Sequence, residues 1–102
     1  MTKYLVHITP AAWKEMKALP GHMRQRVRKA VDALADDPRP AKSKALDIPD
    51  LPIEIRRLRV DRWRIVYAVT DSGETVDVLA VRKRPPYDYG DLESLLKDFP
   101  PE

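Results

Sequence analysis

Apolar residues in the first third of the chain form one short run and then two helical patterns. Residues 3–8, KYLVHI, are β-prone and predict a strand. Thr9 can cap the helix that follows, and Pro10 can occupy its first turn. The sequence PG at residues 20–21 is expected to end this helix. The apolar side of this helix consists of Ala12, Trp13, Met16 and Leu19, and we expect Trp13 and Met16 in the core. A second helix is predicted from about residue 22 to 37, and its apolar residues are Met23, Val27, Ala30, Val31 and Leu34.

In the second half of the chain, apolar and polar residues alternate as they do in β-strands. A proline-rich connector, residues 36–52, leads to predicted strands at about 53–60, 63–70 and 75–83. The sequence DSGE at 71–74 predicts the turn between the last two strands. A closing amphipathic helix is predicted from the spacing of Leu92, Leu95, Leu96 and Phe99, with Asp91 or Asp88 as its cap.

This order of elements predicts one domain, residues 1–102, of the α+β class. We expect the N-terminal strand to join a mainly antiparallel four-stranded sheet. The two helices form a hairpin whose apolar seam packs on one face of that sheet, and the short helix ends the chain.

Residues 58–69, LRVDRWRIVYAV, predict two strands joined by a two-residue turn, although the turn has no glycine. The resulting cross-strand pairs are Val60 with Trp63, Arg59 with Arg64, Leu58 with Ile65 and Arg57 with Val66. Opposed like charges destabilise a sheet by a few tenths to about 1 kcal/mol. An anion between Arg59 and Arg64 would reverse that effect, so the pattern indicates an anionic ligand.

Alternation along these strands predicts one apolar face and one basic face. The apolar face, turned toward the helices, consists of Leu58, Val60, Trp63, Ile65, Tyr67 and Val69, with Val76, Val78 and Ala80 from the last strand. The other face consists of Arg57, Arg59 and Arg64, with Val66, Ala68, Leu79 and Val81. Because this basic face is half apolar, we expect the last helix or a partner's helix to cover part of it. Upstream, Glu54 and Arg56 would point inward, so we expect a bulge near Arg56 or a later start of the strand.

Charge is distributed unevenly, although the formal net charge is only +3. Residues 53–64 hold five arginines against Glu54 and Asp61, and RKR follows at 82–84. The asymmetry indicates an anionic partner for the middle of the chain, with a solvated surface as the alternative. The chain has no cysteine, which excludes disulfides and thiolate metal sites. We expect a cytoplasmic protein, since no apolar run is long enough for a membrane span or a signal peptide.

Arginine is suited to phosphate because its planar fork donates two parallel hydrogen bonds and remains charged. Tyr87 and Tyr89 are placed to stack on unpaired bases. These features favour a nucleic-acid backbone as the ligand. His7 lies in the first strand and His22 at a helix start, so we expect structural roles for both.

The sequence KALDIPDLPIEIRRLRVDRWRIVYAV, followed by VDVLAVRKRPPYDY, resembles the RelE/ParE superfamily of bacterial toxins from type II toxin–antitoxin systems. The most specific part is R-x-R-V-x-x-W-R-I-V-Y with V-x-K-R on the next strand, and the resemblance covers nearly the whole chain. It implies one of two activities. RelE-like members cut mRNA on the ribosome without a metal, by attack of the 2′-hydroxyl on the neighbouring phosphate. ParE-like members share the fold but poison DNA gyrase.

The resemblance also implies roles for individual residues. Arg64 matches the family's arginine on the middle strand, and Arg84 the one that ends the last strand. Arg57 stands where RelE-like proteins often have a catalytic lysine, and Ile55 where a second lysine is found. Arginine is a poor general base. The expected catalytic set is Arg57, Arg64, Arg84 and Tyr87, with Tyr89 as the alternative for proton transfer. The expected RNA-binding set is Arg59, Arg62, Lys42, Lys44, Lys83 and Tyr89.

Three functions therefore remain open. The first is a RelE-like mRNA endonuclease without a cofactor, the second a ParE-like gyrase inhibitor, and the third a degenerate relative that only binds its antitoxin. All three imply a cognate antitoxin as partner, with mRNA on the ribosome or gyrase as the target.

Overall fold

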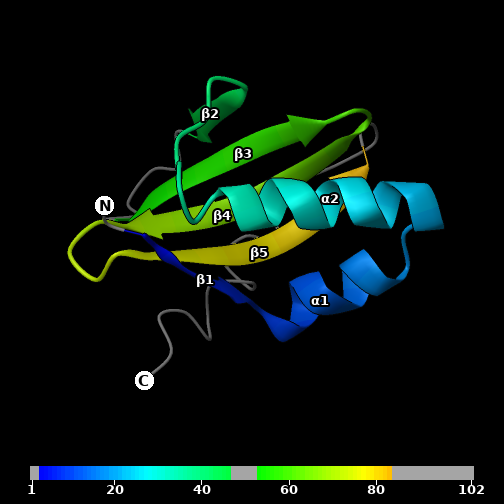
Figure 1. The fold of residues 1–102 in the computed structure, drawn as a ribbon, viewed down its shortest axis with the longest axis horizontal. Coiled ribbons are helices and arrows are strands. Elements are labelled where there is room, and N and C mark those ends of the chain that lie inside the picture. Colours follow the sequence, from blue (N-terminus) through cyan, green and yellow to red (C-terminus); the bar gives the residue numbers. More distant parts are fainter. Residues whose placement is uncertain (1–2, 47–52, 84–102) are drawn as a thin grey trace.

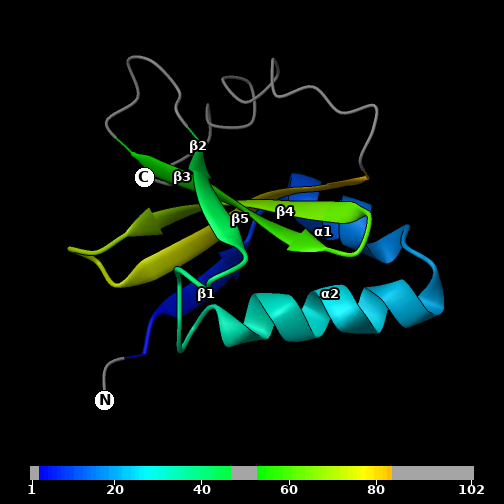
Figure 2. The same ribbon diagram turned by 90° about the horizontal axis from the view of Figure 1, so that it is seen from above.

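The computed structural model describes residues 3–46 and 53–83, and these form two helices and a five-stranded sheet. In chain order the elements are β1 (Leu5–Ile8), α1 (Pro10–Lys17), α2 (Gly21–Ala33), β2 (Ser43–Leu46), β3 (Glu54–Val60), β4 (Trp63–Thr70) and β5 (Thr75–Lys83). The strand order is β1-β5-β4-β3-β2, and both helices lie on one side of the sheet (Figures 1 and 2). The predicted α+β class is confirmed.

The sheet is mixed and has one strand more than the sequence predicts. β1 runs parallel to β5, and the other pairs are antiparallel. The additional strand is β2, which lies within the predicted connector and pairs with β3 from Ser43–Leu58 to Leu46–Ile55. A strand of four residues close to prolines has too little pattern of its own, so the edge of β3 determines its conformation.

The helix ends follow local chemistry. The Thr9 hydroxyl accepts a hydrogen bond from the Ala12 amide at 3.2 Å, as the predicted cap requires, and donates to the Val78 carbonyl at 2.9 Å. Pro10 occupies the first turn of α1, and α2 begins directly after Pro20. The same hydroxyl therefore starts α1 and fastens it to β5.

The main core lies between the helices and the sheet. Its helical residues include Ala12, Met16, Met23, Val27 and Val31, and its strand residues are Leu58, Ile65, Tyr67, Val69, Val76, Val78 and Val81. Met16 is buried as expected. Trp13 is 43% exposed, so its predicted core position is wrong. It lies beside Lys17, whose ammonium is 6.0 Å from the ring centroid.

The predicted β3–β4 register is confirmed, including Arg59 opposite Arg64 and Val60 opposite Trp63. The two-residue turn needs no glycine because Asp61 adopts a φ of 57°, a left-handed conformation that Asp tolerates better than most residues. Neither the bulge expected near Arg56 nor the later start of the strand is found, because β3 begins at Glu54 and pairs with β4 without a shift as far as Val60.

A bulge lies instead on β5, where Val78 pairs with Tyr67 and Ala80 with Val66, so that Leu79 is the extra residue. It reverses the alternation that we predicted for the end of this strand. Ala80 joins Leu79 in a second cluster with Ile55, Val66 and Ala68 on the face away from the helices, and Val81 joins the helix-side core. The predicted sides of Ala80 and Val81 are therefore wrong.

Glu54 and Arg56 do point to the helix side, where the residues after α2 meet them. Arg39 donates to both carboxylate oxygens of Glu54, at 2.9 and 2.6 Å, and to Asp71 at 2.8 Å. Arg56 donates to Glu54 at 3.1 Å and to the Ser43 hydroxyl at 3.0 Å. These bonds hold the segment before β2 against β3.

We predict that this cluster makes folding sensitive to acid. Hydrogen bonding lowers the pKa of Glu54, mainly through Arg39, and the pKa of Asp71, mainly through Tyr4 and then Arg39. A depressed folded-state pKa adds stability above the unfolded pKa, and that stability is lost as pH falls through the folded value. Arg39→Met should therefore lower the free energy of unfolding at pH 7, and its deficit should shrink as pH falls below about 4.5.

Urea unfolding between pH 7 and pH 3 measures this difference. Arg28→Met is the matched control, since Arg28 forms a more exposed pair with Asp32 on α2. An Arg39→Met deficit that stays constant over the whole range would contradict the assignment.

Candidate functional site

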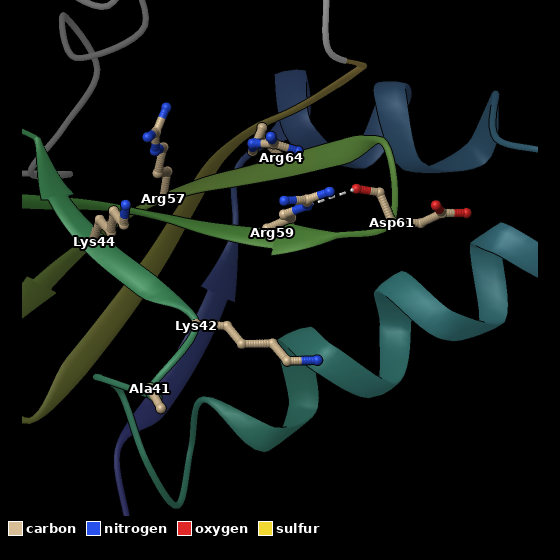
Figure 3. Close-up of a pocket in the computed structure, with 7 residues that line it drawn as sticks. All are labelled: Ala41, Lys42, Lys44, Arg57, Arg59, Asp61 and Arg64. Carbon is tan, nitrogen blue, oxygen red and sulfur yellow. Dashed lines mark hydrogen bonds between the residues drawn. The ribbon is translucent and has the colours of Figure 1, made fainter.

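Basic side chains from β2, β3 and β4 gather on the sheet face away from the helices. The cross-strand registers place Arg59 opposite Arg64 and Lys44 opposite Arg57. Opposed residues share a face of a sheet, so these pairs form two neighbouring basic rows. Figure 3 shows Arg57 and Arg64 projecting to the same side of the sheet.

The rows border a hollow of about 480 Å³, which we call the arginine hollow. Its described lining residues are Ala41, Lys42, Lys44, Arg57, Arg59, Asp61 and Arg64, of which five are basic and one, Asp61, is acidic (Figure 3). Lys42 and Lys44 reach the hollow because β2 pairs with β3. The structure thus brings together five of the residues that the sequence nominated.

Arg64 is the most buried member, with 4% of its surface exposed. Its guanidinium donates to the Trp63 carbonyl at 3.3 Å. Buried charges normally have a charged partner, because desolvation of an isolated ion is costly. The Trp63 carbonyl compensates only part of that cost, so an anion in the hollow would stabilise Arg64.

Arg59 and Asp61 do not neutralise each other through their charged groups. The Arg59 Nε donates to the Asp61 carbonyl oxygen at 3.3 Å (Figure 3). The Asp61 carboxylate lies instead 3.6 Å from Arg26 of α2. The hollow therefore has a strongly positive potential, which favours phosphate or carboxylate ligands.

Arg82 belongs to the same row and was missed by sequence reasoning. It lies opposite Arg64 in the β4–β5 register, which extends the row to three arginines across three strands. Glu15 of α1 accepts from the Val81 amide at 2.9 Å and from the Arg82 Nε at 3.3 Å, beyond the point where β1 stops pairing with β5. The β5 bulge gives Arg82 this register position, and nothing in the sequence marks that bulge. Because its guanidinium pairs with Glu15 of α1, Arg82 is not among the residues that line the arginine hollow.

Other nominated residues lie elsewhere. Lys83 pairs with Trp63, whose side chain packs on the helix-side core, so Lys83 lies on the opposite side from the arginine hollow. Arg62 is exposed in the turn and does not line the hollow. Arg84, Tyr87, Tyr89 and the predicted closing helix lie outside the described residues.

Within residues 3–46 and 53–83 there is neither a cluster of metal-ligating residues nor a membrane-spanning helix. No group of three or more His, Cys, Asp or Glu residues in these segments is placed to hold a metal ion. Neither described helix has the length and hydrophobicity required to cross a bilayer.

Comparison with solved structures identifies RelE proteins with the same fold. The archaeal RelE–RelB complex from Pyrococcus horikoshii OT3 matches with a TM-score of 0.73 and 21% identity, over 84% of this chain and 100% of that chain. The RelBE2 complex from Mycobacterium tuberculosis matches with a TM-score of 0.70 and 24% identity, over 81% of this chain and 100% of that chain. The intact RelBE complex from E. coli matches with a TM-score of 0.59 and 27% identity, over 78% of this chain and 95% of that chain.

The sequence itself matches no curated protein, but it matches one family model, described as the ParE toxin of the type II toxin–antitoxin system parDE. The match extends over residues 6–85, which include every strand of the sheet except the first residue of β1 and all five basic residues of the arginine hollow. The chain is therefore a RelE/ParE superfamily toxin and belongs to the ParE toxin family of type II toxin–antitoxin systems.

Proposed function

We propose that the chain is a RelE-like toxin that binds mRNA on the ribosome and cleaves it in the arginine hollow. The observation that supports this function best is the convergence of three arginines and two lysines in a hollow of about 480 Å³, whose described lining includes one carboxylate. Charge-assisted, bidentate donors of this kind are suited to phosphate oxygens.

The row geometry fits a strand of RNA. Arg57 and Arg59 are two residues apart on β3, so their Cα atoms are separated by roughly 7 Å on one face. This separation is similar to that of successive phosphates in an extended nucleotide chain. Arg59 and Arg64 hold the scissile phosphate, and Arg57 with Lys44 holds its neighbour.

The reaction in this proposal is an internal transesterification. The 2′-oxygen bonds to phosphorus and loses its proton, while the bond from phosphorus to the 5′-oxygen breaks and that oxygen gains a proton. The products are a 2′,3′-cyclic phosphate and a 5′-hydroxyl. Arg59 and Arg64 stabilise the additional negative charge on the phosphate oxygens in the transition state.

Proton transfer requires groups other than arginine, which remains protonated because its ordinary pKa lies far above neutral pH. We assign proton transfer to Tyr87, with Tyr89 as the alternative, and both lie outside the described residues.

A gyrase inhibitor of the ParE type is the second candidate, and the family model favours it. The arginine hollow would then dock a protein surface and no RNA would be cut. An antitoxin partner is proposed in either case, because the similar RelE structures include complexes with RelB.

We predict that Arg64→Ala abolishes growth inhibition and leaves the fold intact. Removal of one oriented donor should slow mRNA cleavage by about 10²–10³-fold, or roughly 2.7–4 kcal/mol. Primer extension on mRNA after induction measures cleavage, and Arg28→Ala is the control with the same charge loss on α2. A fully toxic Arg64→Ala protein would defeat the assignment. Intact mRNA with an SOS response in the wild type would select the gyrase function.

Inorganic phosphate should stabilise the wild-type protein more than chloride does at equal ionic strength. Phosphate that bridges Arg59 and Arg64 binds only the folded state, so thermal unfolding shifts to higher temperature. Arg64→Met should be as stable as wild type in chloride, or more stable by up to about 1 kcal/mol, since it removes an opposed like-charge pair. The Arg64→Met protein also serves as the control, because phosphate stabilises folded proteins in general through its exclusion from the protein surface. An equal phosphate effect on both proteins would show that the anion binds elsewhere.

Asp61→Asn should tighten RNA binding, because it removes the one carboxylate among the described residues that line the arginine hollow. Asn accepts the left-handed backbone at this position, so the turn should persist. Fluorescence anisotropy with 2′-O-methylated RNA, which lacks the nucleophile, measures affinity without cleavage. Asp32→Asn on α2 makes the same charge change away from the hollow. Unchanged or weaker binding by Asp61→Asn alone would count against the site.

A further inference from the structure

The arginine hollow does not end at the face of the sheet. A second hollow of about 330 Å³ adjoins it, and Lys42, Arg59 and Asp61 line both. The two therefore meet around the edge of β3. The second is called the edge hollow below.

The edge hollow exists because β2 is shorter than β3. Pairing between these strands ends at Ser43–Leu58, whereas β3 continues to Val60. The outer edge of β3 is therefore uncovered by β2 at Arg59 and Val60. In Figure 3 the side chain of Lys42 extends from the start of β2 toward α2, across this opening.

α2 supplies the far side of the edge hollow. Arg26 and Lys29 line it, and their i, i+3 spacing places them on one face of the helix. Ala30, Leu58 and Val60 are the apolar members of its lining. The hollow thus combines cations for a phosphate with an apolar surface for a ribose or base.

Among the described residues that line the two hollows, the acidic one is Asp61, and it forms only a weak pair. Asp61 and Arg26 lie 3.6 Å apart, and their side chains are 53% and 55% exposed. An exposed pair of this kind contributes little stability. A phosphate can therefore take the place of the Asp61 carboxylate beside Arg26 at small cost.

We propose that Arg26 and Lys29 of α2 form a second phosphate subsite, which binds single-stranded RNA flanking the strand held in the arginine hollow. The inference rests on the RNA-binding function proposed above. The RNA passes around the uncovered edge of β3, from Arg59 past Lys42 to α2. A short RNA occupies the arginine hollow alone, and a longer one occupies both.

The test uses the full chain with fluorescein-labelled, 2′-O-methylated RNAs of three and eight nucleotides. Anisotropy measured at several salt concentrations gives the affinity and its salt slope. Arg26→Ala/Lys29→Ala should weaken binding of the longer RNA by about tenfold and reduce its salt slope by about 1.4, since each phosphate contact on a single strand contributes about 0.7. The shorter RNA should bind as it does to wild type.

The control is Lys17→Ala/Arg28→Ala, which removes the same charge from residues that line a groove between α1 and α2 and neither of the two hollows. Alanine is a strong helix former, so both variants should remain folded. If the two double variants weaken RNA binding equally, or if Arg26→Ala/Lys29→Ala weakens binding of both RNA lengths equally, the α2 subsite is wrong. Phosphate binding in the arginine hollow would not be contradicted by that result. Failure of the wild-type protein to bind either RNA would overturn the proposed function itself.

Discussion

The pairing of Arg59 with Arg64 across the β3–β4 turn determines where the positive charge of this protein is displayed. The continuous register from Glu54 to Val60 sends every second side chain of β3 to the helix-side core and the others to the opposite face. A shift of one residue would bury the arginines and expose Leu58 and Ile65. Hydrophobic burial beneath the helices therefore stabilises the register that brings like charges together.

The arginines of β3 meet different partners on the two faces. On the helix side, Arg56 is bonded to Glu54 and Ser43, within a cluster that Arg39 completes. On the other face, Arg59 and Arg64 donate to backbone carbonyls, and Asp61, the acidic residue among the described lining of their hollow, pairs with Arg26. Charge is compensated where the chain needs stability and concentrated where a ligand is expected, which is the usual division between structural and functional sites.

Sequence reasoning predicted the central hairpin because turn position, alternation and burial all agree there. It also placed Thr9 and Pro10 at the start of α1, since capping depends on local chemistry. β2 was missed because its conformation depends on pairing with β3. Leu79 carries no signal for a bulge, so Ala80, Val81 and Arg82 were placed on the wrong faces or overlooked. Within the site, the hairpin arginines were therefore predictable and the contribution of β5 was not.

The joint binding of one phosphate by Arg59 and Arg64 is the interaction on which the proposed function depends. Proton–nitrogen NMR of the arginine Nε–H groups, recorded during titration with a 2′-O-methylated trinucleotide, tests it directly. We expect the Arg59 and Arg64 signals to shift together along one saturation curve and those of Arg24 and Arg28 to stay in place. Shifts confined to the helix arginines, or none in Arg59 and Arg64 at saturation, would contradict it.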